Sequence, residues 1–376
     1  MMQSKKLNMT YIFGSGRSNY INSDENFPKE FFYGYFDMRK KLDHLNLIEF
    51  LPKKKKRVLN TFLFFLSKLL RKVTKLSFFI ENVCTYKNFR TLLKTNHIVL
   101  TNDRIGTSLL PFLIIFRIFK INKSTVFVMG LLAKDTNNLI SHIFQRYFLT
   151  IFFKSVNNFI FLSKGECEQA KVSFKKYKDK FYFIPFCVDT NFWKDSNNSD
   201  KEIILFIGND GRREYNFVLQ LASEMTEYKF IFITSNINKK DLLSKNVTLI
   251  KGQWNEKLLS DLEIRDIYNN SILSIIPIKN SYQPSGQSVA LQSMAMNVPV
   301  MITDTSGFWD KDAFIDNKNI FFIKKNNIDI WKKRINEVIE NKDLLKEVTR
   351  NSNKLVNEQY NTNLFYKALQ EIIDNN

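Results

Sequence analysis

Short apolar segments alternate with helix-compatible segments through the second half of the chain, and this alternation restricts the fold more than any other feature. The β-rich apolar runs occupy residues 203–207, 230–234, 247–250, 272–278, 299–303 and 320–323. The stretches between most of them are compatible with helices, and residues 215–225 carry apolar side chains at helical spacing. Strands that alternate with helices form βαβ units, and runs that are apolar throughout are typical of parallel strands covered on both faces. The pattern predicts an α/β domain built on a parallel, doubly wound sheet.

The first half repeats the pattern less regularly. The expected strands are residues 9–13, 97–101, 125–129, 158–162 and 181–184, with a helical region over 58–80 between the first two. A polar segment over 186–200 separates the halves, and the last stretch, 328–374, is helical and charged. A chain of 376 residues suits two domains of roughly 180 residues each. We expect domains over residues 1–190 and 191–357, followed by a C-terminal helix over 358–376.

Net charge and cysteine content restrict the partners and the compartment. The net charge of +19 attracts polyanions: nucleic acid, anionic lipid or a diphosphate-bearing substrate. No nucleic-acid-binding motif accompanies it, so we expect no specific nucleic acid partner. Three widely spaced cysteines form neither a disulfide framework nor a metal cluster, which suits a reducing compartment. No signal-peptide core is visible and no apolar run reaches the ~18–20 residues of a membrane span, so we expect a cytoplasmic protein.

Residues 275–307 form the most informative segment. A buried strand ends near Pro277, and Ser285 is the expected N-cap of a helix over 287–296. Asn297 is expected in the left-handed conformation that ends this helix, and Pro299 prevents its continuation. The next strand, 299–303, completes the unit.

A loop of small residues that opens a helix is an anion site, because backbone N–H groups and the positive end of the helix dipole point to the same place. Gly286 allows a phosphate to approach the backbone, Gln287 contributes a backbone amide, and Ser285 and Ser288 add hydroxyl donors. Gln292 lies ~7–8 Å further along the helix, which is about the distance from a nucleotide's diphosphate to its ribose. The alternative is an ordinary strand–loop–helix unit without a ligand.

The same segment resembles the donor-site signature of the GT4-type family (glycosyl transferases group 1) of GT-B glycosyltransferases. In that family a PS-x-x-E-G loop leads into a helix reading L-E-A-M-A-x-G-x-P-V. The counterpart here is PSGQS at 284–288 followed by LQSMAMNVPV at 291–300. Two further segments are similar to the family's pattern: FIPFCVDTNF at 183–192 resembles its interdomain hinge, and ILFIG at 204–208 resembles the first strand of its donor domain.

The resemblance implies a GT-B fold, which is two Rossmann-like domains facing a central cleft, with the C-terminal helix crossing back to the N-terminal domain. It implies a glycosyltransferase that moves a sugar from a UDP- or GDP-sugar to a glycan or lipid-linked acceptor with retention of configuration. No metal and no cofactor are implied, since the nucleotide sugar is a substrate.

The sequence departs from the family pattern at its paired glutamates. Gln292 replaces the ribose-binding glutamate, and Pro284 stands where the other would fall. The family's basic residues after the first donor-domain strand have no exact match, so Arg212 and Arg213 are the candidates for binding the diphosphate; the alternative is a solvated turn. The missing carboxylates keep two other functions open: a catalytically weakened nucleotide-sugar-binding protein, or a nucleotide-sugar epimerase of GT-B fold.

The N-terminal half carries weaker signals. Gly14 and Gly16 follow the first expected strand as a candidate glycine loop or as a plain turn. The three histidines do not fit the family's catalytic position, so the catalytic residues are not identified. A basic run precedes the helical region at 58–80, either as a contact with an anionic membrane surface on its inner face or as an exposed loop. Its residues are Lys53, Lys54, Lys55, Lys56 and Arg57.

Overall fold

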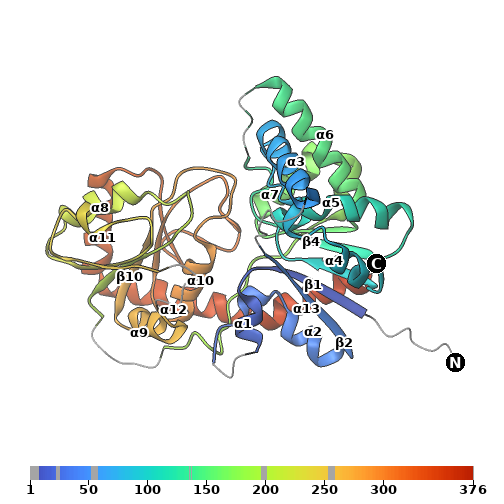
Figure 1. The fold of residues 1–376 in the computed structure, drawn as a ribbon. Helices are drawn as coiled ribbons and strands as arrows, with labels where there is room; N and C mark the ends of the chain where they lie inside the picture. The colour runs from blue at the N-terminus through green and yellow to red at the C-terminus, as the bar shows by residue number, and fades with distance from the viewer. Residues whose placement is uncertain are drawn as a thin grey trace. The chain divides into compact units, whose positions relative to one another are not determined.

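The structure is a computed structural model that describes residues 8–22, 26–51, 58–134, 136, 138–195, 201–252 and 259–375. The chain divides into two compact units (Figure 1). The N-terminal unit comprises residues 1–25, 32–184 and 366–376, and the C-terminal unit comprises residues 26–31 and 185–365. Each unit holds one six-stranded sheet, and all strand pairs in both sheets are parallel. The predicted class, two Rossmann-like α/β domains, is confirmed.

The sheet of the N-terminal unit has the order β2-β1-β3-β4-β5-β6. Its strands are β1 (Asn8–Gly14), β2 (His44–Phe50), β3 (His97–Leu100), β4 (Lys123–Val128), β5 (Asn158–Phe161) and β6 (Phe181–Phe183). Its helices are α1 (Arg17–Ile21), α2 (Tyr35–Lys41), α3 (Val58–Thr74), α4 (Tyr86–Leu93), α5 (Asp103–Ile118), α6 (Leu139–Ser155) and α7 (Lys164–Ser173). The last helix, α13 (Thr362–Asp374), contributes its residues from Tyr366 onward to the same unit.

Side chains of β1 show why this sheet is covered on both faces. Ile12 belongs to the core formed with α5, α6 and α7, whereas the neighbouring rings of Tyr11 and Phe13 both lie against Tyr35 of α2. Successive strand residues point to opposite faces, so one apolar run supplies two cores. In the second of these cores Tyr366 of α13 lies beside Gly34, directly before α2.

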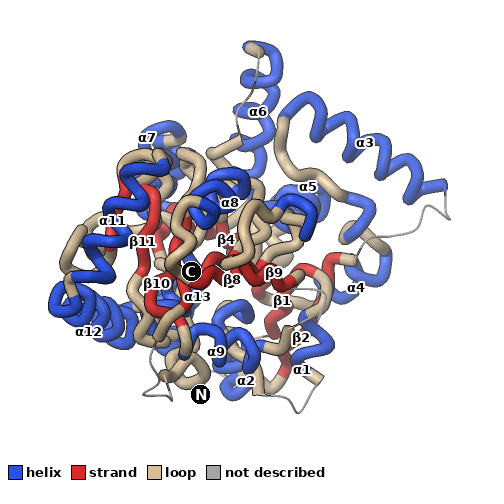
Figure 2. The backbone as a smooth tube through the Cα atoms, turned by 90° about the vertical axis from the view of Figure 1, so that its left-hand side faces the viewer, coloured by secondary structure: helices blue, strands red, loops and turns tan. Residues whose placement is uncertain are grey.

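The sheet of the C-terminal unit has the order β12-β11-β10-β7-β8-β9. Its strands are β7 (Ile203–Ile207), β8 (Lys229–Ile233), β9 (Val247–Ile250), β10 (Ser271–Ile276), β11 (Val300–Thr303) and β12 (Phe321–Ile323). Its helices are α8 (Tyr215–Ser223), α9 (Asp261–Asn269), α10 (Gln287–Ala295), α11 (Ile328–Glu340) and α12 (Lys342–Gln359). Figure 2 shows the strands of this sheet in red between blue helices.

The order of the second sheet reverses at β7, because β8 and β9 lie on one side of it and β10 to β12 on the other. In open α/β sheets, ligands bind beyond the carboxyl ends of the strands at such a switch point. The loops that follow β7 and β10 are therefore the expected site in this unit.

All expected strands are present, with bounds that shift by up to two residues. The strand β2 was not expected. Most of its side chains are only half-buried, because it lies at the edge of the sheet, so its apolar pattern is weak. The helical region expected over 58–80 ends earlier, at Thr74, where Lys75 has a left-handed backbone with φ 60°.

The Phe153 ring is the centre of an aromatic cluster in the N-terminal core, with ring centroids 4.8–4.9 Å from those of Phe159, Phe174 and Phe181. Replacement of Phe153 by alanine leaves a cavity and is expected to reduce the free energy of unfolding by about 3–5 kcal/mol. Urea unfolding followed by circular dichroism measures the loss. The matched control is Phe119→Ala, where the ring is 70% exposed, with an expected change within about 0.5 kcal/mol. Equal losses for the two variants would contradict this account of the core.

Candidate functional site

The loop between β10 and α10 places a glycine at the start of α10. Gly286 is the N-cap and has φ 84°, a conformation that side chains rarely adopt. A Cβ atom at this position would lie 2.7 Å from Cγ2 of Ile276, so the backbone also passes too close to β10 for a side chain. The expected N-cap, Ser285, is therefore wrong by one residue, and α10 begins without a side-chain cap.

The end of α10 follows the sequence prediction. Asn297 has φ 53°, and Pro299 stands directly before β11. The helix, its left-handed end and the following strand were thus readable from local residue preferences.

Arg213 approaches the start of α10 from the loop after β7. Its Nη1 atom lies 3.4 Å from the place of a Cβ on Gly286, and its side chain lies so close to Gly208 that a Cβ there would overlap it. The guanidinium is held by an Nε hydrogen bond to the carbonyl of Ile207 (3.2 Å) and an ion pair with Asp210 (3.3 Å). The structure therefore brings together two of the predicted site residues, Arg213 and Gly286, by placing glycine on both sides of the arginine.

Ser285 carries a buried hydroxyl with no hydrogen-bond partner among the residues that the structure describes. A buried polar group without a partner is unfavourable by about 1–3 kcal/mol, and such groups in native proteins call for an explanation. The residue directly precedes Gly286 at the open end of the helix. Its Oγ atom thus has an unused donor next to the start of α10.

The other predicted diphosphate residues lie in the loop after β7, next to Arg213, or in the first turn of α10. Arg212 is half-buried, and its Nε donates to Oε1 of Gln283 at 3.4 Å, in the loop that leads to α10. Gln287 is buried in the first turn of α10, and Ser288 is half-buried beside it. Amides in the first turn of a helix have no acceptor within the helix, and the helix dipole adds a partial positive charge there. With Arg213 this end of α10 is suited to bind an anion.

Gln292 makes contacts that the sequence did not predict. Its Nε2 donates to Oε1 of Glu30 at 2.9 Å, and its Oε1 accepts from the hydroxyl of Tyr268 at 3.4 Å. Both ends of the amide are thus bound inside the C-terminal unit, and the side chain is largely buried. Its role toward a ribose stays a prediction.

Glu30 is the residue that sequence reasoning missed. It belongs to the short segment 26–31, which packs with the C-terminal unit although it comes from the first tenth of the chain. Besides Gln292, its carboxylate accepts from Nε1 of Trp193 (2.8 Å) and from the backbone N–H of Asp189 (3.2 Å). A single glutamate in the segment NFPKEF has no motif around it, so no local signal reveals this contact.

Burial raises the pKa of Glu30 to about 7, although the hydrogen bonds from Gln292 and Trp193 act in the opposite direction. A carboxyl with this pKa changes its protonation near neutral pH. The Glu30 side chain is 1% exposed, so its carboxyl group contacts Gln292 inside the protein and does not face solvent.

In the N-terminal unit, the loop after β4 is fixed by two buried carboxylates. Glu166 accepts from the backbone N–H groups of Gly130 and Leu132, each at 2.9 Å, and Asp103 accepts from that of Met129 at 3.2 Å. Burial raises the pKa of Glu166 to about 7. These contacts were not predicted, and they hold the backbone of the loop after β4 at residues 129, 130 and 132.

The candidate glycine loop lies between β1 and α1, as expected. Gly14 ends the strand, and Gly16 has φ 93° at the start of the five-residue helix α1. A Cβ atom at Gly14 would meet no atom within 4 Å, so this glycine borders open space. The basic run from Lys53 to Arg57 lies outside the described residues.

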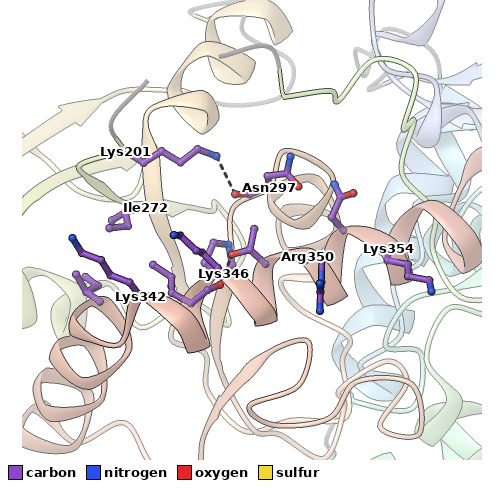
Figure 3. A pocket seen from close by; sticks show the side chains of 12 residues that line it. Lys201, Ile272, Asn297, Lys342, Lys346, Arg350 and Lys354 are labelled. Carbon is purple, nitrogen blue, oxygen red and sulfur yellow. Dashed lines mark hydrogen bonds between the residues drawn. The ribbon is translucent and has the colours of Figure 1, made fainter. Parts of the chain in front are cut away.

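A groove of about 670 Å³ lies elsewhere on the C-terminal unit (Figure 3). Lys342, Lys346, Arg350 and Lys354, four residues apart along α12, line it together with Lys201, which precedes β7. Lys201 is bound to Asp195 and to the carbonyl of Asn297. The groove adjoins the amino ends of the strands, whereas Gly286 and Arg213 follow their carboxyl ends, so it is not the candidate donor site.

Comparison with known proteins identifies the C-terminal unit. Residues 188–355 match the family described as "Glycosyl transferases group 1". The chain carries a group 1 glycosyltransferase domain. This domain contains Arg213, the loop 284–288 and Gln292, whereas Glu30 and the glycine loop lie outside the matched residues. A sequence search of curated proteins gives no significant match.

Solved structures with the same fold extend over nearly the whole chain. HepE of Anabaena in complex with UDP is 12% identical, covers 98% of this chain and 100% of its own, and has a TM-score of 0.67. Sucrose-phosphate synthase of Thermosynechococcus elongatus is 12% identical, covers 98% of both chains and has a TM-score of 0.66. A glycosyltransferase of Rickettsia africae has the same identity and coverage with a TM-score of 0.62. The GT-B fold of this glycosyltransferase is therefore confirmed.

The Glu30–Gln292 contact predicts the effect of restoring a glutamate in α10. In Gln292→Glu a second carboxylate faces Glu30 at hydrogen-bond distance, so we expect a loss of about 2–4 kcal/mol at pH 8 and a smaller loss at pH 5, where the pair shares a proton. The double variant Glu30→Gln/Gln292→Glu is expected to recover only part, because a glutamine cannot accept all three hydrogen bonds of Glu30. Urea unfolding of the two single variants and the double variant gives the coupling energy. Additive effects within about 0.5 kcal/mol would show that the two side chains do not interact.

The raised pKa of Glu30 predicts a dependence of stability on pH. The folded protein binds this proton more tightly than the unfolded chain, whose glutamate has the ordinary value of 4.5. This contribution is therefore fully present below about pH 4.5 and is lost as the pH rises through about 7. The stability of the wild type relative to Glu30→Gln should fall by an amount on the order of 2–3 kcal/mol across this window. Unfolding curves at pH 4.5, 6 and 8 measure it, and a difference independent of pH would refute the assignment.

Proposed function

We propose that this glycosyltransferase moves a sugar from a UDP- or GDP-sugar to a glycan or lipid-linked acceptor, as in polysaccharide biosynthesis, with retention of configuration and without a metal ion. The observation that carries the proposal is the anion site at the start of α10. There the guanidinium of Arg213 lies beside the glycine backbone at Gly286, and the hydroxyl of the adjacent Ser285 has no described hydrogen-bond partner.

These groups match the charge that develops during transfer. Departure of the nucleoside diphosphate leaves negative charge on the phosphate oxygens, and fixed donors aimed at that charge lower the barrier. Arg213 is suited to this role, because its guanidinium is always charged and is already positioned by Ile207 and Asp210. Arg212, Gln287 and Ser288 complete the diphosphate site in this proposal.

Gln292 is proposed to meet the ribose through the hydrogen-bonding capacity that its internal partners leave unused. An amide has two N–H groups and two oxygen lone pairs, and Glu30 and Tyr268 each take one. Glu30 then acts as a positioning residue, because it determines which end of the amide points outward.

The UDP donor is favoured over GDP by the relatives. HepE of Anabaena has been solved with UDP and with UDP-glucose. The acceptor site is proposed to lie on the N-terminal unit, at the loop of Gly14 and Gly16 after β1, where a Cβ on Gly14 would meet no atom within 4 Å. We further propose that the enzyme works in the cytoplasm, peripheral to the inner face of the membrane.

A nucleotide-sugar-binding protein without transfer activity is the second candidate. The observation in its favour is that Gln292 is engaged with Glu30 and that no carboxylate stands at its position. Release of UDP from UDP-sugars in the presence of a mixed pool of glycan and lipid acceptors separates the two, since the binding protein releases none.

Ser285→Ala tests the donor site directly. Removal of a buried hydroxyl without a partner should leave the free energy of unfolding unchanged or raise it by up to about 1 kcal/mol. If that hydroxyl donates to a phosphate, the loss of a charge-assisted hydrogen bond should weaken UDP binding about tenfold or more in isothermal titration.

The matched control is Ser274→Ala. Ser274 lies in β10, is buried, and also has no hydrogen-bond partner for its hydroxyl among the described residues. It should show the same change in stability and an unaltered affinity for UDP. Failure of the wild type to bind UDP or GDP at millimolar concentration would remove the proposed function, and equal affinities of wild type and Ser285→Ala would remove Ser285 from the site.

A further inference from the structure

The helices α3 and α6 of the N-terminal unit contact each other and carry an unusual concentration of exposed apolar side chains. They lie side by side in Figure 1. Nine large hydrophobic residues on them are at least 45% exposed, out of 17 that are exposed to this extent in the described chain. They are Leu59, Phe62, Phe65, Leu69, Leu139, Ile140, Ile143, Phe144 and Tyr147. Scattered single residues of this kind are normal, but a contiguous group marks an interaction surface.

The helix α3 is apolar on two faces. Leu63, Leu66 and Leu70 pack against the core of the unit, whereas Phe62 and Leu69 point away from it and are 62% and 57% exposed. The face that carries Leu63, Leu66 and Leu70 therefore provides the packing of α3 against the core. The second face remains available for an apolar environment outside the N-terminal unit.

The part of the chain that contains these helices is strongly basic. Residues 58–165 contain fifteen lysines and arginines and three acidic residues, an excess of twelve positive charges out of nineteen in the whole chain. Two of the three acids are buried and bound internally: Glu81 by Ser67 and Asp103 by Lys134. The third, Asp135, lies outside the described residues.

We propose that the outer faces of α3 and α6 form a docking surface for a bilayer with anionic lipids. Apolar side chains on an amphipathic helix enter the boundary between headgroups and acyl chains, and flanking lysines and arginines bind the headgroups. Each basic residue close to an anionic surface contributes about 1 kcal/mol, so the excess of positive charge favours a lipid surface over a neutral protein partner. None of the described helices combines the length and apolarity needed to cross a bilayer, so these helices would lie in the interface.

This inference deepens the proposed peripheral attachment and names its residues, which are not the basic run at 53–57 that the sequence suggested. It does not depend on sugar transfer. A test without nucleotide or acceptor therefore separates its failure from that of the proposed enzymatic activity.

The test is co-flotation of the full chain with vesicles of phosphatidylcholine alone or with one third phosphatidylglycerol, at low salt and at 0.5 M NaCl. The wild type should float with the anionic vesicles and should keep part of its binding at high salt, because apolar insertion is not screened. The variant Phe62→Ser/Leu69→Ser/Ile140→Ser/Ile143→Ser should lose at least tenfold in partition coefficient. The four side chains are exposed, so its thermal unfolding should match that of the wild type.

The matched control removes four exposed apolar side chains from the C-terminal unit: Leu243→Ser/Leu262→Ser/Ile315→Ser/Ile330→Ser. Its vesicle binding should equal that of the wild type. Wild-type protein that stays at the bottom of the gradient with both vesicles overturns the proposal, as does equal flotation of the two quadruple variants. A wild-type dimer that the α3/α6 variant dissociates, without vesicle binding, would assign the surface to a second copy of the chain and overturn the proposal as well.

Discussion

The proposed donor site depends on the left-handed backbone of Gly286 between β10 and α10. At φ 84° the chain turns into the helix directly against Ile276, and α10 begins without a side-chain cap. The space next to it is filled by the guanidinium of Arg213, which itself fits only because Gly208 has no side chain. Two glycines thus allow a fixed positive group and a helix terminus to stand together. An alanine at either position would displace Arg213 or the start of α10, and the anion site would be disrupted.

The exchange of a glutamate for Gln292 has a physical explanation in Glu30. A carboxylate at position 292 would face a second carboxylate in a buried place, where two like charges strongly disfavour joint ionisation. The amide removes this conflict and supplies the donor that Glu30 accepts at 2.9 Å. In the family's motif the carboxylate stands on the helix itself. In this chain the carboxylate belongs to Glu30, in the segment 26–31. It also accepts hydrogen bonds from Trp193 and from the backbone N–H of Asp189, so it connects α10 to residues 189–193.

Local patterns determined what was predictable. Features that depend on a few neighbouring residues were predicted. The periodicity of apolar residues predicts the parallel strands and the helix at 287–296, and the backbone preference of Asn297 with the following proline predicts where that helix ends. The edge strand β2 was missed because its side chains are only half-buried and its pattern is correspondingly weak. Glu30 and Glu166 were missed for a different reason. Their partners are 262 and 36 residues away in sequence, at Gln292 and Gly130, and nothing local to a glutamate reveals a distant buried donor.

Unsatisfied groups in this chain point to ligands on two scales. At Ser285 one hydroxyl is buried without a described partner, and its cost is of the size that one hydrogen bond to a phosphate would offset. On α3 and α6 the unsatisfied feature is an apolar surface that is exposed to water, formed by large side chains such as Phe62 and Tyr147. A small ligand cannot cover such an area, whereas an interface that is apolar inside and anionic at its edge covers both the rings and the surrounding lysines. The proposed nucleotide site is therefore the start of one helix, α10, and the proposed membrane surface extends along two helices, α3 and α6.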